Sequence, residues 1–250
     1  MISLSGQTAL VTGGSRGIGR AAVLLLAEAG ADVGLTYRTR AADAESVAGA
    51  VRALGRRAFV AGGDLADSAT VDRIFTECRR VFPRLDIFIG NAGVWPVEEV
   101  SFRDLPEARW RQTMAANLDA IYLTTRAALR LMGPGGRVVL VGSTAGQRGE
   151  AYHADYAATK GAMIALTKSL AIECAPGIRV NCVAPGWVDT EMSASSLAGE
   201  GGERIARTIP LGRAATAEEI AGPILFLCSD LARHLTGEIL NVNGGSVLCG

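Results

Sequence analysis

The sequence predicts an α/β protein: a single doubly wound parallel β-sheet with helices on both faces. Short apolar runs such as TALV, DIFIG and RVVLVG alternate with longer segments of helical periodicity. These runs are apolar almost throughout, which is typical of parallel strands buried on both faces. No linker, low-complexity tract or repeat divides the 250 residues. We therefore expect one domain over residues 1–250.

Strands and helices are expected in strict alternation. The expected strands are Thr8–Val11, Asp32–Tyr37, 57–61, 85–89, 137–141, 178–183 and Ile239–Val242. The expected helices are 18–29, 41–54, 70–81, 105–132, 156–173 and Ala217–Cys228. Gly30 and Gly55 follow the first two helices, where glycine commonly ends a helix. The stretch 190–210 is rich in Gly, Ser and Ala, and we expect it to form a mobile lid over the substrate.

Composition and charge argue against several classes of protein. The formal net charge is zero, and no run of Lys or Arg supplies the basic face that nucleic-acid binding needs. The cysteines form no CxxC pair and only two histidines are present, so we expect no metal site. The cysteines are Cys78, Cys174, Cys182, Cys228 and Cys249. Without an apparent signal peptide or membrane span, we expect a cytoplasmic protein with reduced thiols.

A glycine-rich loop follows the first strand. Residues 12–19 read TGGSRGIG, and three of the four glycines, Gly13, Gly17 and Gly19, give a GxxxGxG spacing. Glycines let the backbone approach a pyrophosphate, and the following helix offers free N–H groups and a positive dipole end. Since this spacing differs from the GxGxxG fingerprint, an ordinary strand–helix turn is the alternative.

The end of the second strand bears on which nicotinamide dinucleotide binds. NAD-specific sites usually place an acidic residue there, but residues 36–40 read TYRTR and no carboxylate comes before Asp43. Arg38 and Arg16 can instead bind a 2′-phosphate, or both can be solvated surface arginines. Asp64 can hydrogen-bond the adenine or cap a helix. The sequence thus favours NADP(H), with NAD(H) as the alternative.

A tyrosine and a lysine four residues apart indicate acid/base chemistry. Tyr156 and Lys160 lie on one face of an expected helix. A tyrosine with an ordinary pKa near 10 is a poor base, and a neighbouring ammonium would lower that pKa. Such a pair also arises by chance on helices. We expect Tyr156 to be the acid/base of a hydride transfer.

Polar residues near strand ends support this site. Ser143 follows the strand 137–141, where open α/β sheets place ligands, and it can hydrogen-bond a substrate oxygen or close an ST-turn. Asn117 is a poor helix former inside a helical segment, so it either carries a water relay to Lys160 or is a polar interior residue.

Together these residues resemble the short-chain dehydrogenase/reductase family, and within it the 3-oxoacyl-(acyl carrier protein) reductase group. The matching pieces are TGGSRGIG (12–19), DL (64–65), NAG (91–93), Asn117, Ser143, Tyr156-x-x-x-Lys160 and PGWVDT (185–190). The resemblance implies a Rossmann-type fold with Asn117, Ser143, Tyr156 and Lys160 as catalytic residues. It implies cofactor contacts from Gly13, Ser15, Arg16, Gly17, Ile18, Gly19, Tyr37, Arg38, Asp64, Leu65, Asn91, Ala92, Gly93, Tyr156, Lys160, Pro185, Gly186, Val188 and Thr190.

The substrate pocket is expected to be mostly uncharged. Its expected lining residues are Trp95, Ser143, Ala145, His153, Tyr156 and Trp187. These suit an apolar or mixed carbonyl or secondary alcohol, and the resemblance adds a 3-oxoacyl thioester on a carrier protein. The resemblance also implies a homotetramer through helices 105–132 and 156–173, with a second interface in the segment 239–250.

The sequence therefore predicts an NADP(H)-dependent oxidoreductase that transfers a hydride between nicotinamide and a carbonyl or secondary alcohol. One alternative is an NAD-dependent alcohol or sugar dehydrogenase of the same fold. A sugar epimerase or dehydratase is another, although such relatives use a different glycine spacing. The third is a nucleotide-sensing binding protein, against which the intact set of Ser143, Tyr156 and Lys160 argues.

Overall fold

The structure, a computed structural model, describes residues 2–248 and shows one seven-stranded sheet in which every pairing is parallel. The strand order is β3-β2-β1-β4-β5-β6-β7. The strands are β1 (Thr8–Val11), β2 (Asp32–Tyr37), β3 (Ala58–Gly62), β4 (Leu85–Gly90), β5 (Met132–Val141), β6 (Ile178–Pro185) and β7 (Ile239–Val242). The predicted doubly wound fold is confirmed. Cys249 and the end of the expected 239–250 interface lie outside the described residues.

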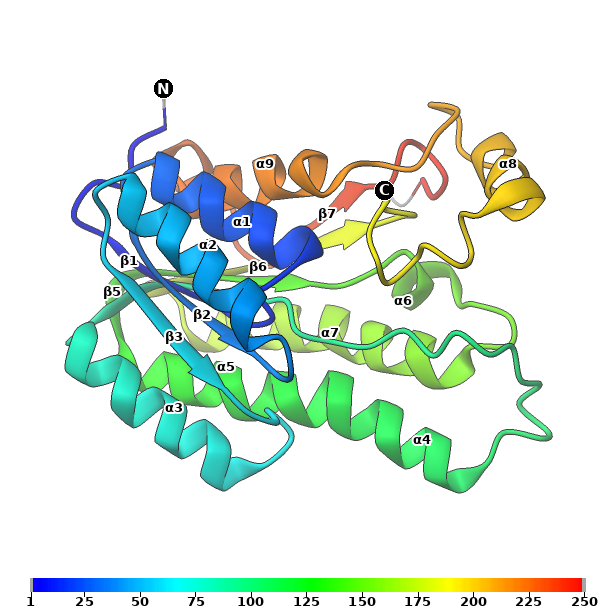
Figure 1. Ribbon diagram of the computed structural model, residues 1–250, viewed down its shortest axis with the longest axis horizontal. Helices are drawn as coiled ribbons and strands as arrows, with labels where there is room; N and C mark the ends of the chain where they lie inside the picture. Colours follow the sequence, from blue (N-terminus) through cyan, green and yellow to red (C-terminus); the bar gives the residue numbers. More distant parts are fainter. Residues whose placement is uncertain (1, 249–250) are drawn as a thin grey trace.

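Helices cover both faces of the sheet (Figure 1). One layer holds α1 (Gly17–Glu28), α2 (Ala41–Ala53) and α9 (Ala217–Cys228). The other layer holds α3 (Ser68–Val81), α5 (Ala120–Leu131) and α7 (Ala154–Glu173). No helix within residues 2–248 is long and apolar enough to cross a membrane.

Two separate cores explain why the strands are apolar throughout. In β4, Ile87 and Ile89 pack into the core beneath α1, α2 and α9, whereas Phe88 between them packs into the core beneath α3, α5 and α7. Successive side chains of a strand point to opposite faces. Because helices cover both faces of the sheet, the residues that point to either face are buried.

The order of strands reverses between β1 and β4, and this reversal positions the site. The chain moves outward from β1 through β2 to β3 and then returns to β4 on the other side of β1. Connections that diverge in this way leave a crevice at the carboxyl ends of the strands, where open α/β sheets bind ligands.

The prediction of one long helix over 105–132 was wrong in detail. The structure has α4 (Glu107–Met114), a π-helical segment at Ala115–Asp119 and α5. The chain then enters β5 at Met132, five residues earlier than the expected strand start. Sequence periodicity does not show a π-helical turn, which adds one residue to a helix without ending it.

Three short helices were not predicted. They are α6 (Ala145–Arg148), α8 (Gly199–Arg207) and a 3₁₀ turn at Asp230–Ala232. Helix α8 lies inside the expected lid, and none of its residues is buried. It therefore has no apolar face buried against the sheet, which is the signal that reveals the longer helices.

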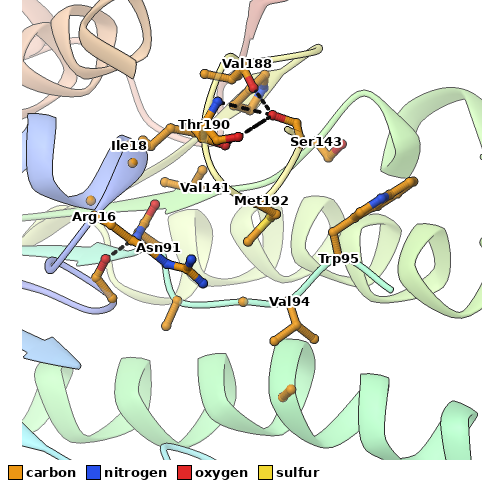
Figure 2. Close-up of a pocket in the computed structure, with 18 of the residues that line it drawn as sticks. Arg16, Ile18, Asn91, Val94, Trp95, Val141, Ser143, Val188, Thr190 and Met192 are labelled. Atoms are coloured by element: carbon orange, nitrogen blue, oxygen red, sulfur yellow. Dashed lines mark hydrogen bonds between the residues drawn. The ribbon is translucent and has the colours of Figure 1, made fainter. Parts of the chain in front are cut away.

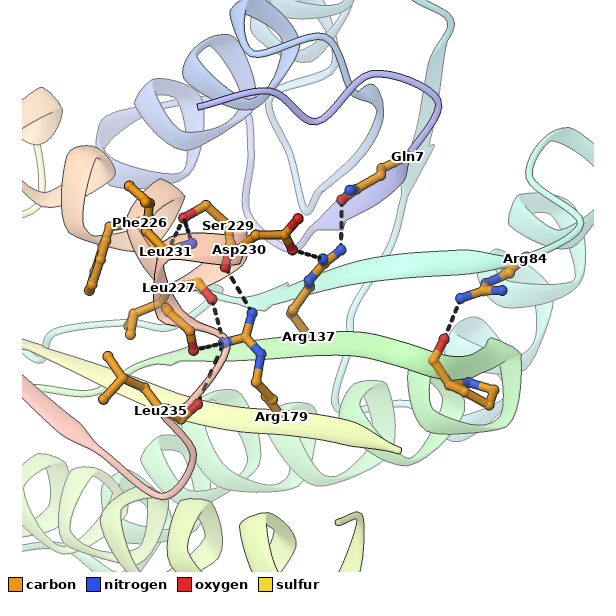
Figure 3. Close-up of polar contacts among 12 residues, drawn as sticks. Gln7, Arg84, Arg137, Arg179, Phe226, Leu227, Ser229, Asp230, Leu231 and Leu235 are labelled. Carbon is orange, nitrogen blue, oxygen red and sulfur yellow. Dashed lines mark hydrogen bonds and ion pairs between the residues drawn. The ribbon is translucent and has the colours of Figure 1, made fainter. Parts of the chain in front are cut away.

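A part-buried arginine joins the sheet to the end of α9 (Figure 3). Arg179 of β6 donates hydrogen bonds to the carbonyl oxygens of Leu227 at 3.0 Å, Ala232 at 2.8 Å and Ser229 at 3.0 Å. The last carbonyls of a helix have no intrahelical partner, so this guanidinium satisfies groups that would otherwise be unpaired. The neighbouring Arg137 donates to Gln7 at 2.8 Å and contacts Asp230 at 2.9 Å.

We expect Arg179→Ala to lower the free energy of unfolding by about 2–4 kcal/mol, because it leaves several carbonyls without a donor. Urea unfolding followed by circular dichroism measures this change. The control is Arg111→Ala, which removes an exposed i,i+4 ion pair and should change stability by less than about 0.5 kcal/mol. Equal effects of the two substitutions would contradict the assignment.

Candidate active site

A cavity of about 350 Å³ lies at the carboxyl edge of the sheet. Every cofactor-contact residue expected from the sequence lines it, from Gly13 in the β1–α1 loop to Thr190 after β6. Figure 2 shows Arg16 and Asn91 at one side of this cavity and Trp95 at the opposite side. The cavity therefore brings together residues from loops that are far apart in the sequence.

The glycine-rich loop has the shape of a phosphate cradle. Gly13 and Gly17 adopt positive φ angles of 67° and 52°, which glycine tolerates without strain. A Cβ atom at Gly19 would lie 2.2 Å from the Gly13 carbonyl oxygen, so no larger residue fits there. Helix α1 has no side-chain N-cap and no acidic residue in its first turn. Its free N–H groups and positive end thus suit the pyrophosphate of a dinucleotide.

Hydrogen bonds between loops hold this cradle in place. The Thr12 hydroxyl accepts from the backbone N–H of Asn91 at 2.9 Å and of Ala92 at 3.0 Å. In return the Asn91 side chain donates to the carbonyl oxygen of Thr12 at 2.9 Å. Asn91 was expected to contact the cofactor; besides lining the cavity, it ties the β4 loop to the phosphate loop.

Acidic side chains pair with the arginines at one end of the cavity, called here the adenosine end because the sequence predicts that the adenosine binds there. Arg38 lies 2.9 Å from a carboxylate oxygen of Asp64, and Arg16 lies 2.8 Å from Glu191. Asp67, not Asp64, caps α3 by accepting from the Thr70 N–H at 2.9 Å. The helix-cap alternative for Asp64 is therefore wrong.

Burial has the largest effect on the pKa of Tyr156, the tyrosine that lines the cavity. Burial raises the pKa of Tyr156 to about 12, contact with the Ser143 hydroxyl lowers it in part, and the charge of Glu150 raises it. The lowering of this pKa by Lys160, expected from the sequence, stays a prediction, because burial is the largest influence on the phenol in this structure. The removal of water outweighs the favourable contacts.

The lysine is buried next to the tyrosine ring. Its Nζ lies 5.6 Å from the centroid of the Tyr156 ring and donates a hydrogen bond to the carbonyl oxygen of Val141 at 2.8 Å. Burial lowers the pKa of Lys160 to about 8, an effect that the charge of Cys182 partly offsets. The ammonium is thus held by the sheet edge and can be neutralised just above neutral pH.

Aromatic rings form the opposite wall of the cavity. The ring of Trp95 meets Tyr156 edge to face at a centroid distance of 4.8 Å and Trp187 at 6.0 Å. Behind it, His153 stacks on Trp95 at 4.0 Å. His153 was expected to line the pocket, but it is 5 % exposed and supports Trp95 from behind.

Comparison with known proteins agrees with this geometry. A family model described as enoyl-(acyl carrier protein) reductase matches residues 13–246. The L-rhamnose 1-dehydrogenase (NAD(P)(+)) of Sphingomonas sp. is 39 % identical, with 97 % of this chain and 96 % of that protein covered. A 3-oxoacyl-(acyl carrier protein) reductase of Aquifex aeolicus is 38 % identical over 98 % of both chains. A short-chain dehydrogenase from Burkholderia cenocepacia, solved in complex with NADP, has a TM-score of 0.92 at 36 % identity, covering 97 % of this chain and 98 % of its own.

The chain belongs to the short-chain dehydrogenase/reductase family. It is therefore an oxidoreductase of a family that uses nicotinamide cofactors. As the resemblance implied, the family includes 3-oxoacyl-(acyl carrier protein) reductases among the similar proteins.

Asn117 of this short-chain dehydrogenase/reductase does not line the cavity. It lies in the π-helical segment, is 1 % exposed, and exchanges two hydrogen bonds with the backbone of Val94 at 2.7 and 2.9 Å. Its side chain thus fixes the loop that carries Trp95. π-helical turns frequently occur at functional sites, and the water relay to Lys160 stays a prediction.

Two groups of residues near the site make contacts that the sequence did not predict. Asp155 is fully buried, and it binds Arg109 at 3.1 Å and the Thr113 hydroxyl at 2.8 Å, which fastens α4 to the start of α7 beside Tyr156. Arg40 and Glu191 also line the cavity. Arg40 could have been chosen as a second basic residue after β2, whereas no motif marks Glu191.

The buried ammonium should make stability depend on pH. Between about pH 8 and the ordinary lysine pKa of 10.5, the unfolded chain keeps a proton on Lys160 that the folded chain has released. Stability therefore rises with pH across this window, and the gain is lost as the pH falls through 8. From about pH 8 to about pH 9.5, the wild type should gain about 2 kcal/mol relative to Lys160→Met.

Urea unfolding of both proteins at the two pH values measures this difference. Lys168→Met, which changes an exposed lysine of the same helix, is the matched control and should show little dependence on pH. A constant difference between the wild type and Lys160→Met would show that Lys160 does not titrate in this window.

Proposed function

We propose that this chain is an NADP(H)-dependent oxidoreductase that transfers a hydride between the nicotinamide and a carbonyl or secondary alcohol. The observation that carries the proposal is the convergence of Ser143, Tyr156 and Lys160 beside the glycine cradle, in one cavity at the switch point of the sheet. A non-enzymatic nucleotide sensor would not need this set. The arginines at the end of β2 support NADP(H) over NAD(H).

Each of the three residues has a distinct role in the proposed reaction. A nicotinamide held in this cavity would supply or accept the hydride. Tyr156 donates its proton to the carbonyl oxygen during reduction, and its raised pKa keeps that proton available at neutral pH. Ser143 orients the same oxygen. Lys160 binds the ribose next to the nicotinamide and places a positive charge near the phenol.

Reduction and oxidation use different protonation states of Tyr156. A phenol with a pKa of about 12 is an acid held in its protonated form, whereas alcohol oxidation needs the phenolate as base. Oxidation therefore depends on additional stabilisation of the phenolate by Lys160 and by the positive nicotinamide ring. The Ser143 hydroxyl accepts a hydrogen bond from the backbone N–H of Ala145 at 3.1 Å. This ST-turn fixes the position of the hydroxyl for both reduction and oxidation.

We expect Tyr156→Phe to lower kcat by about 10²- to 10⁴-fold, because it removes the proton donor. Cofactor affinity should stay within about twofold, since the ring and the cradle are retained. Stopped-flow turnover and fluorescence titration of NADPH measure the two quantities. Tyr122→Phe, at a half-exposed tyrosine of α5, is the control; turnover of Tyr156→Phe near the wild-type level would overturn the assignment.

Two substrate classes fit the proposal, and the aromatic wall distinguishes them. A ring sugar would pack a flat face against Trp95 and Trp187, as suits the relative named L-rhamnose 1-dehydrogenase. A 3-oxoacyl thioester, the substrate class of the other named relative, would instead extend its chain past the lid. The aromatic rings at the cavity wall favour testing the sugar first.

A spectrophotometric screen tests function and substrate together. It would pair NADPH, NADH, NADP⁺ and NAD⁺ with sugars, simple ketones, quinones and 3-oxoacyl thioesters. If a sugar is the substrate, Trp95→Ala should raise its KM by about tenfold or more while kcat falls less, because stacking area is lost. Cofactor binding without turnover of any compound would favour the nucleotide-sensing alternative.

The quaternary structure and location are proposed on the family resemblance. Exposed apolar side chains of α5 and α7, such as Tyr122 and Ile172, fit the proposed homotetramer. A cytoplasmic location, and a lid at 190–210 that moves with the substrate, complete the proposal.

A further inference from the structure

A glutamate from the lid segment reaches back to the adenosine end of the cavity. One carboxylate oxygen of Glu191 lies 2.8 Å from Nη1 of Arg16 and 2.6 Å from Nη2 of Arg40. Arg40 also lies 3.2 Å from Asp43. Glu191 therefore bridges two guanidinium groups that come from the phosphate loop and from the end of β2.

These two arginines form an anion slot. Arg16 precedes α1 and Arg40 follows β2, and both line the dinucleotide cavity. They also line a smaller polar pocket next to it, together with Ser15, Arg20 and Ser46. Residues after the second strand of a dinucleotide-binding sheet face the 2′ position of the adenosine ribose, and paired guanidinium groups bind phosphate well.

Glu191 occupies this slot and comes from a third segment of the chain, the one after β6. It is 175 residues from Arg16 in the sequence, and Thr190 beside it contacts the phosphate loop, where a Cβ atom on Gly17 would lie 3.4 Å from the Thr190 methyl group. The other arginine of the region, Arg38, pairs with Asp64 at 2.9 Å. Each of these three arginines thus has a carboxylate partner within the protein.

We infer that Glu191 is a specificity-determining residue that competes with the 2′-phosphate of NADP(H) for Arg16 and Arg40. A carboxylate and a phosphate dianion cannot share the slot without repulsion, so NADP(H) must displace Glu191. NAD(H) carries a hydroxyl at this position and leaves the ion pairs intact. Glu191 therefore lowers the affinity for NADP(H) but not for NAD(H). It thereby reduces the preference of the protein for NADP(H). This inference rests on the proposed function.

The solvent exposure of these ion pairs determines how strongly Glu191 affects the affinity for NADPH. The side chains of Arg16, Arg40 and Glu191 are each about half exposed, and exposed ion pairs are weak individually and screened by salt. Removing the competing carboxylate should therefore tighten NADPH binding by about three- to tenfold, not by orders of magnitude.

Direct binding measurements test the inference without relying on turnover. NADPH and NADH are titrated against the full chain by nucleotide fluorescence, for the wild type, Glu191→Gln and Arg40→Gln. Glu191→Gln should lower the Kd of NADPH by about three- to tenfold at low salt and leave the Kd of NADH within about twofold. Arg40→Gln should raise the Kd of NADPH, because it removes half of the slot. The ratio of the two Kd values isolates the 2′-phosphate from any general change in the lid.

The matched control is Glu200→Gln, which removes a carboxylate from the same segment at an exposed position without an ion pair among residues 2–248. It should leave both Kd values unchanged. If Glu191→Gln changed the Kd values of NADPH and NADH equally, or weakened NADPH binding, the inference about Glu191 would be wrong, whereas the proposed function would be unaffected. If the wild type bound neither nucleotide, the proposed function itself would be wrong.

Discussion

The close approach of two loops at the centre of the sheet is the constraint on which the rest of the site depends. A Cβ atom at Gly13 would lie 3.1 Å from the Cα of Ala92, so the β1 and β4 loops meet backbone to backbone. The hydrogen bonds between Thr12 and Asn91 close this contact. Because β1 and β4 are adjacent at the point where the strand order reverses, this contact forms the floor of the crevice. The phosphate cradle lies on one side of it and the aromatic wall on the other.

The chemistry of the site comes from placing polar groups where water is scarce. Tyr156 and Lys160 both have pKa values shifted toward their neutral forms by burial. Burying an ammonium costs stability, and the Val141 carbonyl offsets only part of that cost. Active sites commonly hold titratable groups in such unfavourable environments, where burial and neighbouring charges shift their pKa values. Catalysis and stability therefore place opposite demands on Lys160.

Supporting residues keep this arrangement rigid from behind. Asn117 holds the backbone at Val94, His153 stacks under Trp95, and Asp155 fastens the start of α7 to α4 through Arg109. None of these three side chains lines the cavity. Their contacts nevertheless determine where Trp95 and Tyr156 lie. At the far end, the ion pairs of Glu191 with Arg16 and Arg40 similarly hold the segment after β6 against the phosphate loop and the end of β2.

Much of the architecture and the inner part of the site were predictable from local sequence. Apolar runs buried on both faces marked the strands, and glycines after the first two helices marked their ends. The GxxxGxG spacing and the Tyr156–Lys160 pair indicated a nucleotide site, because each depends on residues close together in the chain. The π-helical interruption and the early start of β5 escaped prediction, since neither changes the apolar pattern.

Only the tertiary structure decided the direction of the Tyr156 pKa shift, the supporting position of His153 and the pairing of Glu191 with Arg16 and Arg40. Each depends on burial or on contacts between segments far apart in the sequence. Sequence alone thus determined which groups could perform the chemistry. Packing determined which of them contact the cavity and which hold others in place, because solvent exclusion and long-range ion pairs arise only after the sheet assembles.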